Sequence, residues 1–285
     1  MLPPEPNVGD IHRASATTRD LADGKLLVDE PAAGLVRLTI CNPAKRNALD
    51  EPILDAISET LASLSQTSDA RCVILTGAHG MFCAGYDIGD IPETEFEERA
   101  EALVAHPFTE AIDALERFPY PTLAALPGHT IGGGLELALA CDLRVANADI
   151  MLGMPPAKLG LVYSHTGLQR FIDAIGPVRT RELFLLGRYI GAATALNWGL
   201  VNRVVTNAQL DAVTFELADE LAGNAPLSQV GNKRVIRALL KERNALSADC
   251  ERELIALRQA SFASQDMREG VCAFSQKRSP SWSGR

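Results

Sequence analysis

The stretch Gly128–Asp142 constrains the fold of this chain more than any other. Strand-like residues 120–126 lead into it, and three consecutive glycines at 132–134 precede an apolar helical run containing Glu136. Glycine permits positive φ and close approach to the backbone, and the free N–H groups at a helix start favour negative charge. The stretch therefore predicts a tight strand-to-helix turn whose amides can stabilise an oxyanion, with an acid/base group beside them. A helix packed tightly on a strand, with Glu136 complementing the helix dipole, is an equally good interpretation of this stretch alone.

The composition is that of an acidic chain without the marks of a nucleic-acid or membrane protein. It has 285 residues, 47% of them apolar and 22% charged, and a net charge of −9. The sequence has no prominent Lys/Arg cluster that would bind nucleic acid or an anionic membrane. It also lacks a run of about 18 apolar residues, so it predicts no membrane span. We expect residues 1–22 to form a flexible arm rather than a signal peptide, and we expect a cytoplasmic protein.

Cysteine and histidine usage predicts neither disulfides nor a metal site. The six cysteines form no C-x-x-C motif and mostly lie in apolar runs, which is typical of reduced, buried thiols. The five histidines show no metal-ligand spacing. Cys83 lies in a glycine-containing turn, but its neighbours indicate packing rather than an activated nucleophile. A phosphate-binding loop is excluded too, because the glycines at 132–134 lack the Gly-Lys-Ser/Thr ending.

Hydrophobic patterning predicts an α/β region followed by helices. The expected strands are 26–30, 35–40, 72–77, 120–126, 143–146 and 150–153, and the expected helices include 51–65, 226–240, 247–265 and 267–276. Residues 93–117 are acidic and amphipathic, which indicates a surface helix or a mobile flap, and residues 166–223 alternate helices and turns. We divide the chain into the arm 1–22, an α/β core at 23–205 and a helical region at 206–285.

Three loops carry the residues of greatest chemical interest. They span residues 42–49, 82–88 and 128–136, and each follows a predicted strand, where open α/β sheets bind ligands. The pieces Asn42-Pro-Ala-Lys-Arg-Asn-Ala-Leu49, Phe82-Cys-Ala-Gly-Tyr-Asp-Ile88 and the glycine stretch together resemble the enoyl-CoA hydratase/isomerase (crotonase) superfamily, in order and in spacing. The resemblance runs from about residue 24 to Lys277.

The resemblance implies a fold, an assembly and a substrate class. The fold would be a crotonase-like core of ββα repeats with an all-helical C-terminal region, and the assembly a homotrimer or a dimer of trimers. The substrate would be an acyl-CoA thioester, as in fatty acid metabolism, with coenzyme A as part of the substrate and no tightly bound cofactor. The shared chemistry stabilises a thioester enolate with two backbone N–H groups.

The resemblance also implies roles for particular residues. The two amides would belong to Tyr86 and Gly133, Glu136 would be the acid/base, and Tyr163 is a further catalytic candidate. Lys45, Arg46 and Lys277 match cations that meet CoA, although ordinary exposed lysines and arginines are the alternative. The substrate-binding positions implied are Lys45, Arg46, Ala48, Ala84, Tyr86, Asp87, Ile88, Gly132, Gly133, Pro155, Pro156 and Lys277.

One position departs from the hydratase pattern. Hydratases of this family use two glutamates to hold and activate water. Glu136 matches the first, but Pro156 stands where the second is expected, and proline has neither an acid/base group nor an N–H donor. We therefore expect slow or narrow hydration with Glu136 alone, or a different enolate reaction; isomerisation, which commonly uses the same second carboxylate, is disfavoured too.

The segment after Pro156 leaves alternatives open. Tyr163, in a Leu-Gly-x-x-Tyr setting, resembles the methylmalonyl-CoA decarboxylase branch, where a tyrosine contacts the substrate carboxylate. Tyr86 stands where that branch has histidine, so the match is partial, and Tyr163 is equally well a buried structural residue. His165 is best interpreted as a loop or core histidine. The leading hypothesis is a hydratase-like lyase; the alternatives are an acyl-CoA decarboxylase and a catalytically weak CoA-binding scaffold.

Overall fold

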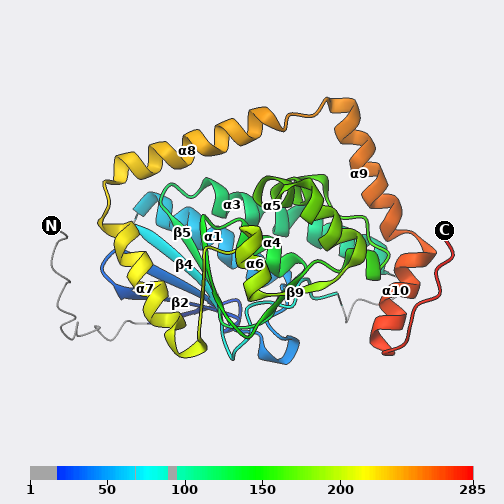
Figure 1. Cartoon of the computed structure of the whole chain (residues 1–285), viewed down its shortest axis with the longest axis horizontal. Helices are drawn as coiled ribbons and strands as arrows, with labels where there is room; N and C mark the ends of the chain where they lie inside the picture. Colours follow the sequence, from blue (N-terminus) through cyan, green and yellow to red (C-terminus); the bar gives the residue numbers. More distant parts are fainter. Residues whose placement is uncertain (1–17, 68, 89–94, 285) are drawn as a thin grey trace.

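A computed structural model describes residues 18–67, 69–88 and 95–284, and within them two sheets organise the α/β fold (Figure 1). The larger sheet has the order β1-β2-β3-β4-β5-β7-β10 and the smaller the order β6-β8-β9. The strands are β1 (Arg19–Leu21), β2 (Leu26–Ala32), β3 (Leu35–Ile40), β4 (Cys72–Gly77), β5 (Thr122–Leu126), β6 (Thr130–Ile131), β7 (Leu143–Asn147), β8 (Met151–Gly153), β9 (Tyr189–Gly191) and β10 (Arg203–Val205). The predicted α/β class is confirmed.

The strands follow the hydrophobic runs in the sequence. β2 and β3 form the predicted antiparallel hairpin, in which Leu26 faces Ile40, and β3, β4, β5, β7 and β10 pair in parallel. All residues of β5, and all of β4 except Thr76, are buried. Parallel strands covered on both faces need such continuous apolar runs, so burial explains why these segments were recognisable in the sequence.

The structure differs in part from the flexible arm predicted for residues 1–22. Residues 1–17 lie outside the described residues, but Arg19–Leu21 form strand β1 on the edge of the large sheet. Ala22, Asp23 and Gly24 have positive φ and turn the chain back into β2. Pairing with Leu26–Val28 satisfies backbone groups of the short segment, which has too few apolar residues for its sequence to predict a strand.

Helices cover both faces of the large sheet. They are α1 (Glu51–Thr67), α2 (Phe96–Leu103), α3 (Thr109–Arg117), α4 (Gly133–Leu139), α5 (His165–Leu186), α6 (Ala192–Trp198), α7 (Asn207–Gly223), α8 (Pro226–Arg243), α9 (Ala248–Phe262) and α10 (Gln265–Ser275), with a π-helical turn at Val104–Phe108 and 3-10 turns at Pro43–Lys45 and Pro156–Lys158. Residues of α1, α3, α4 and α5 share the main core, whereas α7 packs on the opposite face. Asp50 caps α1 as the sequence predicts, through an Ile53 N to Oδ1 hydrogen bond of 3.1 Å.

The chain beyond β10 is helical, as predicted. α8 runs along the outside of the molecule, and α9 and α10 follow it around one end (Figure 1). No residue of α8 is buried. Phe262 and Met267, from α9 and α10, form a small core with Val104, and Tyr86 packs against it. Of the helices in the described parts of the chain, none combines the length and apolar character that a membrane crossing requires.

A buried arginine holds the short helix α4 in place. Arg144 donates from Nη1 to Cys141 O at 2.6 Å and from Nε to Leu200 O at 2.7 Å. Its Nη1 also lies 3.4 Å from the carbonyl oxygens of Ala138 and Leu139, at the helix C-terminus. A cation at this end complements the helix dipole. The hydrogen bonds of Arg144 therefore hold the C-terminal end of α4, which helps to fix the orientation of the helix and of the glycines at its N-terminus.

Candidate active site

Backbone bridges join the three loops that the sequence singled out. Leu49 pairs with Tyr86 in a parallel bridge, in which Leu49 N donates to Gly85 O at 2.8 Å. Cys83 pairs with Thr130 in a second parallel bridge. The loop 42–49 is therefore held against the loop 82–88, which is in turn held against the glycine stretch.

The glycines allow these loops to approach closely. Gly132 has φ +57° and ψ −128°, a conformation that suits glycine alone. A β carbon on Gly133 would lie 2.5 Å from Cε1 of Tyr86, and one on Gly134 would lie 2.6 Å from Cβ of Cys83. On the facing loop, a β carbon on Gly85 would lie 3.6 Å from Gly133 N. Side chains at Gly133 and Gly134 would push the two loops apart.

Two backbone amides at this junction have no acceptor among the described residues. Gly133 is the first residue of α4, so its N–H is one of the unpaired donors of a helix start. The bridge to Leu49 uses Gly85 O and Asp87 N, which leaves Tyr86 N unpaired within the described parts of the chain. These are the two donors that the sequence comparison with the family implied.

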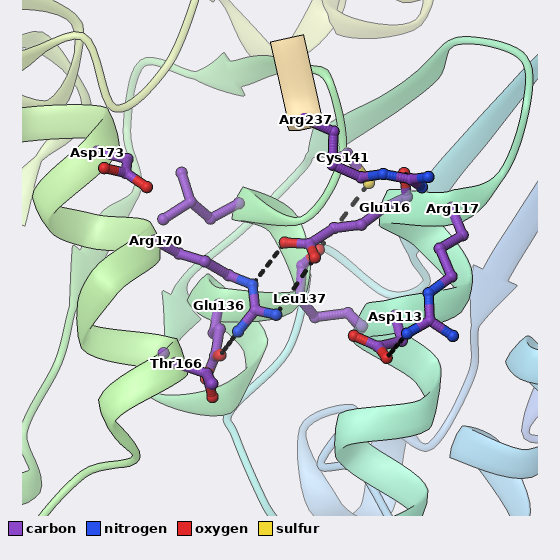
Figure 2. A network of polar contacts seen from close by, with 12 residues as sticks. Asp113, Glu116, Arg117, Glu136, Leu137, Cys141, Thr166, Arg170, Asp173 and Arg237 are labelled. Atoms are coloured by element: carbon purple, nitrogen blue, oxygen red, sulfur yellow. Dashed lines mark hydrogen bonds and ion pairs between the residues drawn. The ribbon is translucent and has the colours of Figure 1, made fainter. Parts of the chain in front are cut away.

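Glu136 lies in α4, one helical turn after Gly133, and both of its carboxylate oxygens accept hydrogen bonds. It is 1% exposed. Oε2 accepts from the Tyr163 hydroxyl at 2.6 Å, and Oε1 accepts from Arg170 Nη1 at 2.9 Å. Arg170 also donates from Nε to Glu116 Oε1 at 2.6 Å (Figure 2). The carboxylate is thus buried but paired, as a buried charge must be.

Burial shifts the ionisation of the groups in this site. It raises the pKa of Glu136, while the charge of Arg170 and the Tyr163 hydrogen bond oppose the rise. Burial also raises the pKa of Tyr163 and of Tyr86 well above the ordinary value of 10.0. Both phenols therefore stay protonated near neutral pH.

Tyr86 and Tyr163 meet at the wall of a small cavity. Their hydroxyl oxygens are 3.2 Å apart, and the Tyr86 ring contacts Phe108 edge-on with centroids 4.8 Å apart. The cavity has a volume of about 10 Å³, enough for a single water molecule. The residues that line it are Tyr86, Val104, Leu161, Val162, Tyr163, Ser164, Arg258 and Phe262.

Sequence comparison decides the family. The sequence model of the enoyl-CoA hydratase/isomerase family matches residues 30–285. The chain belongs to this family. Membership makes it an acyl-CoA enzyme, and the fold and the three connected loops agree with that assignment.

Relatives and solved structures of enoyl-CoA hydratase/isomerase enzymes cover nearly the whole chain. Carnitinyl-CoA dehydratase of Proteus mirabilis is 33% identical over 263 residues, which cover 88% of this chain and 96% of the relative. Methylmalonyl-CoA decarboxylase, solved in complex with 2-nitronate-propionyl-CoA, has a TM-score of 0.83 at 27% identity, over 92% of this chain and 99% of that one. An enoyl-CoA hydratase/carnithine racemase from Magnetospirillum magneticum has a TM-score of 0.71 at 30% identity, over 92% of this chain and 96% of that one.

This family member has no carboxylate at position 156. Pro156 is buried in the 3-10 turn Pro156–Lys158 that follows β8 and Pro155. Its carbonyl accepts hydrogen bonds from the amides of Leu159 and Leu161, so the turn is closed on itself. The groups that approach Glu136 come instead from Tyr163 and from α5.

The predicted CoA-binding residues fall into two sets. Most lie in the connected loops: Lys45 Nζ is 3.4 Å from Asp87 Oδ1, and Arg46 O accepts from Ala84 N at 3.1 Å. Ala48, Ile88, Gly132 and Pro155 belong to the same loop cluster or to the turn beside it. Lys277, by contrast, is exposed after α10, and its side chain makes no hydrogen bond or ion pair within the described part of the chain.

Two other groups are less suited to chemistry. Burial raises the pKa of the Cys83 thiol to about 12, so the thiol is not a nucleophile at neutral pH. His165 begins α5, and its Nε2 lies 3.7 Å from Glu251 Oε1 on α9.

Sequence reasoning missed Arg170 and Glu116. A glutamate in the apolar run Leu135–Leu139 indicates that a cation must lie nearby, because an unpaired buried charge is too costly. The chain contains 27 lysines and arginines, and nothing in their spacing singles out Arg170. Its pairing with Glu136 becomes visible only when α4 and α5 are packed together.

Proposed function

We propose that this protein is an acyl-CoA lyase that hydrates an enoyl-CoA thioester, or dehydrates the product, through an enolate. Glu136 would be the base, and Tyr163 would be the proton donor in place of a second carboxylate. The observation that carries this proposal is the 2.6 Å hydrogen bond to buried Glu136 from the hydroxyl of Tyr163, a residue that lines the cavity beside Tyr86. The two groups are within direct proton-transfer distance of each other.

The oxyanion would be held by the amides of Tyr86 and Gly133. Support comes from their lack of acceptors among the described residues and from the tight packing of Tyr86 on Gly133, where an added β carbon would lie 2.5 Å from the Tyr86 ring. Backbone donors of this kind are preorganised, and each typically lowers the barrier by about 3 kcal/mol. Tyr86 would also shape the acyl pocket, because its ring lies against Gly133.

Protons balance over one turnover with this pair. Glu136 takes a proton from water as the water oxygen bonds to the β carbon, and the electron pair moves to the thioester oxygen. Tyr163 then donates its proton to the α carbon. The proton on Glu136 returns to the Tyr163 oxygen along their hydrogen bond, which restores both groups. Each carboxylate oxygen of Glu136 accepts one hydrogen bond in the structure and has a second lone pair for water.

Decarboxylation is the second candidate. Pro156 removes the second carboxylate that hydration ordinarily uses, and the solved structure of methylmalonyl-CoA decarboxylase is similar over 92% of this chain. Loss of CO₂ from a carboxyacyl-CoA leaves the electron pair in the same enolate and needs no base. Tyr163 would then protonate the α carbon and regain its proton from water. A CoA-binding scaffold without turnover remains the non-catalytic alternative.

Two substrates and two variants distinguish these reactions. We expect crotonyl-CoA hydration by the wild type and a loss of about 10²- to 10⁴-fold in Glu136→Gln. If the protein is a decarboxylase, methylmalonyl-CoA will release CO₂, Glu136→Gln will retain most of that activity, and Tyr163→Phe will lose it. Equal hydration by wild type and Glu136→Gln would remove Glu136 from the mechanism. Binding of both thioesters without turnover would leave the non-catalytic CoA-binding scaffold as the remaining hypothesis.

The partners proposed are the acyl-CoA thioester and further copies of this chain. Several apolar side chains of the region 206–285 are exposed, among them Leu227, Val235, Ile236, Leu239 and Phe274. Burying such a surface is the usual reason for a stable homo-oligomer. We propose a homotrimer or a dimer of trimers built on the region 206–285.

A further inference from the structure

Arg170 links two carboxylates that lie on different helices. Its Nη1 donates to Glu136 Oε1 of α4 at 2.9 Å, and its Nε and Nη2 donate to Glu116 of α3 at 2.6 and 3.3 Å (Figure 2). The exposed fraction of the side chain is 2% for Glu136, 18% for Arg170 and 31% for Glu116. Charge pairs are weakly screened at such burial, so the pairing matters for the ionisation of Glu136.

The cluster carries one cation for two carboxylates. Tyr163 is the neutral donor on the other oxygen of Glu136, and Tyr86 touches Tyr163 in turn. Other charges are occupied elsewhere: Asp113 pairs with Arg117 on α3, and Arg237 of α8 donates to the Glu116 carbonyl oxygen at 3.1 Å. Glu116 therefore draws on the same guanidinium that stabilises the charge of Glu136, and the two carboxylates compete for it.

We propose that Arg170 is a positioning residue that keeps Glu136 ionised and oriented for proton transfer, and that Glu116 sets how strongly it does so. The inference rests on the role of Glu136 as base in the proposed function. Arg170 holds Oε1 while Tyr163 holds Oε2, so the carboxylate plane is fixed by two donors from the segment 163–170. The alternative is a purely structural strap that joins α3, α4 and α5.

The positioning role predicts that substitutions of Arg170 and of Glu116 shift the pH midpoint of Glu136 ionisation in opposite directions, whereas the structural role does not. Arg170→Met removes the cation and should raise the pH midpoint of Glu136 ionisation by about one to three units. Glu116→Gln removes the competing carboxylate, leaves the guanidinium to Glu136, and should lower that midpoint. Arg170→Lys keeps the charge without the bidentate geometry and should give a smaller rise. A structural strap predicts loss of stability in all three variants without this opposition in sign.

Infrared spectroscopy measures the ionisation state of Glu136 directly, without relying on enzymatic turnover. The carbonyl stretching band of protonated Glu136 is followed as pH falls and is assigned by its absence in Glu136→Gln. Arg117→Met is the matched control, because it removes an exposed arginine of α3 that pairs with Asp113, and its midpoint should equal that of the wild type. The pH dependence of thioester turnover is recorded on the same proteins and should shift in the same directions.

The outcomes separate this inference from the proposed function. A folded Arg170→Met protein with the wild-type midpoint, or a Glu116→Gln protein with a raised midpoint, overturns the inference. If Arg170→Met does not fold, Glu116→Gln and Arg170→Lys still decide it. Midpoints that move as expected in a protein that turns over no thioester support the electrostatic role and sink the proposed function instead.

Discussion

At the scale of single residues, opposing influences act on Glu136. Burial raises the pKa of its carboxyl, and Arg170 and Tyr163 lower it without cancelling the rise. A general base works best with a pKa near the working pH, so this environment suits a carboxylate that must take and return a proton. Tyr163, whose pKa burial raises, keeps its proton through the same pH range.

The pH dependence of hydration should follow from these two directions. In the proposed reaction Glu136 acts as a base in its deprotonated form, so kcat/KM should rise with pH through an acid limb above the ordinary pKa of 4.5. Tyr163 must stay protonated, so it should add no basic limb below pH 10.0. The measurement is kcat/KM for crotonyl-CoA across pH in wild type and Glu136→Gln. An acid limb that persists unchanged in Glu136→Gln contradicts the assignment.

Gly133 has room for no side chain on the Tyr86 side. A β carbon there would lie 2.5 Å from the Tyr86 ring, so Gly133→Ala should displace Tyr86 and with it one amide of the proposed oxyanion site. We expect kcat/KM to fall by about 10²-fold, the loss seen when one such donor is removed. Gly231→Ala is the control, because nothing lies within 4 Å of its added carbon on α8. Full activity in Gly133→Ala would show that the Tyr86 amide is not needed where it lies.

At the scale of elements, one buried asparagine connects the loop 42–49 to the segment that precedes the loop 82–88. Asn47 is fully buried, and its Oδ1 accepts from Asn42 N at 2.8 Å. Its Nδ2 donates to Ala78 O at 3.0 Å and to Met81 O at 2.8 Å. Asn47 also has φ +58°, a conformation that asparagine tolerates better than alanine. The side chain fixes the loop 42–49 against the segment that leads to Tyr86.

Asn47→Ala should therefore loosen this part of the site. Three lost hydrogen bonds and the unfavourable φ should lower the free energy of unfolding by about 3 kcal/mol. Acyl-CoA affinity should fall with it, because Lys45 and Tyr86 lie on the two loops that separate. Urea unfolding and a binding titration measure the two effects. Asn232→Ala, which removes only a 3.4 Å contact to Ser228 on α8, should change neither; equal effects in both variants would contradict the role of Asn47.

At the scale of the whole molecule, polar contacts tie α8 to the body. Lys233 donates to Asp142 Oδ2 at 2.7 Å and to Tyr120 O at 3.1 Å, and Arg237 donates to the Glu116 carbonyl oxygen. Most of the large apolar side chains of α8 are exposed, including Leu227 at 88% and Leu239 at 66%. An 18-residue helix with no buried residue gains little from the hydrophobic effect within one chain, which is why we propose that a second copy covers it.

A charge on α8 should break that assembly. Leu239→Glu places a carboxylate in a surface that must lose water on association, so the sedimentation coefficient should fall from that of an oligomer to that of a single chain. Glu59→Lys on α1, also exposed, should sediment like the wild type. A wild-type protein that sediments as a single chain at micromolar concentration would refute the proposed assembly.

Local patterns in the sequence were sufficient to predict much of the fold and the family. Apolar runs predicted the hairpin and the parallel strands, because strands buried on both faces need them. Three loop motifs, recognised together, led to the enoyl-CoA hydratase/isomerase family, and the glycine run predicted a strand-to-helix turn. Pro156 was visible as a missing carboxylate. All of these are properties of short segments, and they hold whatever the rest of the chain does.

Only the tertiary structure decided what surrounds Glu136. Arg170 is 34 residues away in sequence, and Tyr163 and Tyr86, whose hydroxyls meet beside it, are 77 residues apart. The sequence alone determined that a carboxylate would lie next to a glycine turn. Which cation neutralises it, which phenol reaches it and which second carboxylate competes depend on how α3, α4 and α5 pack, because pairing of charges across helices leaves no periodic trace along the chain.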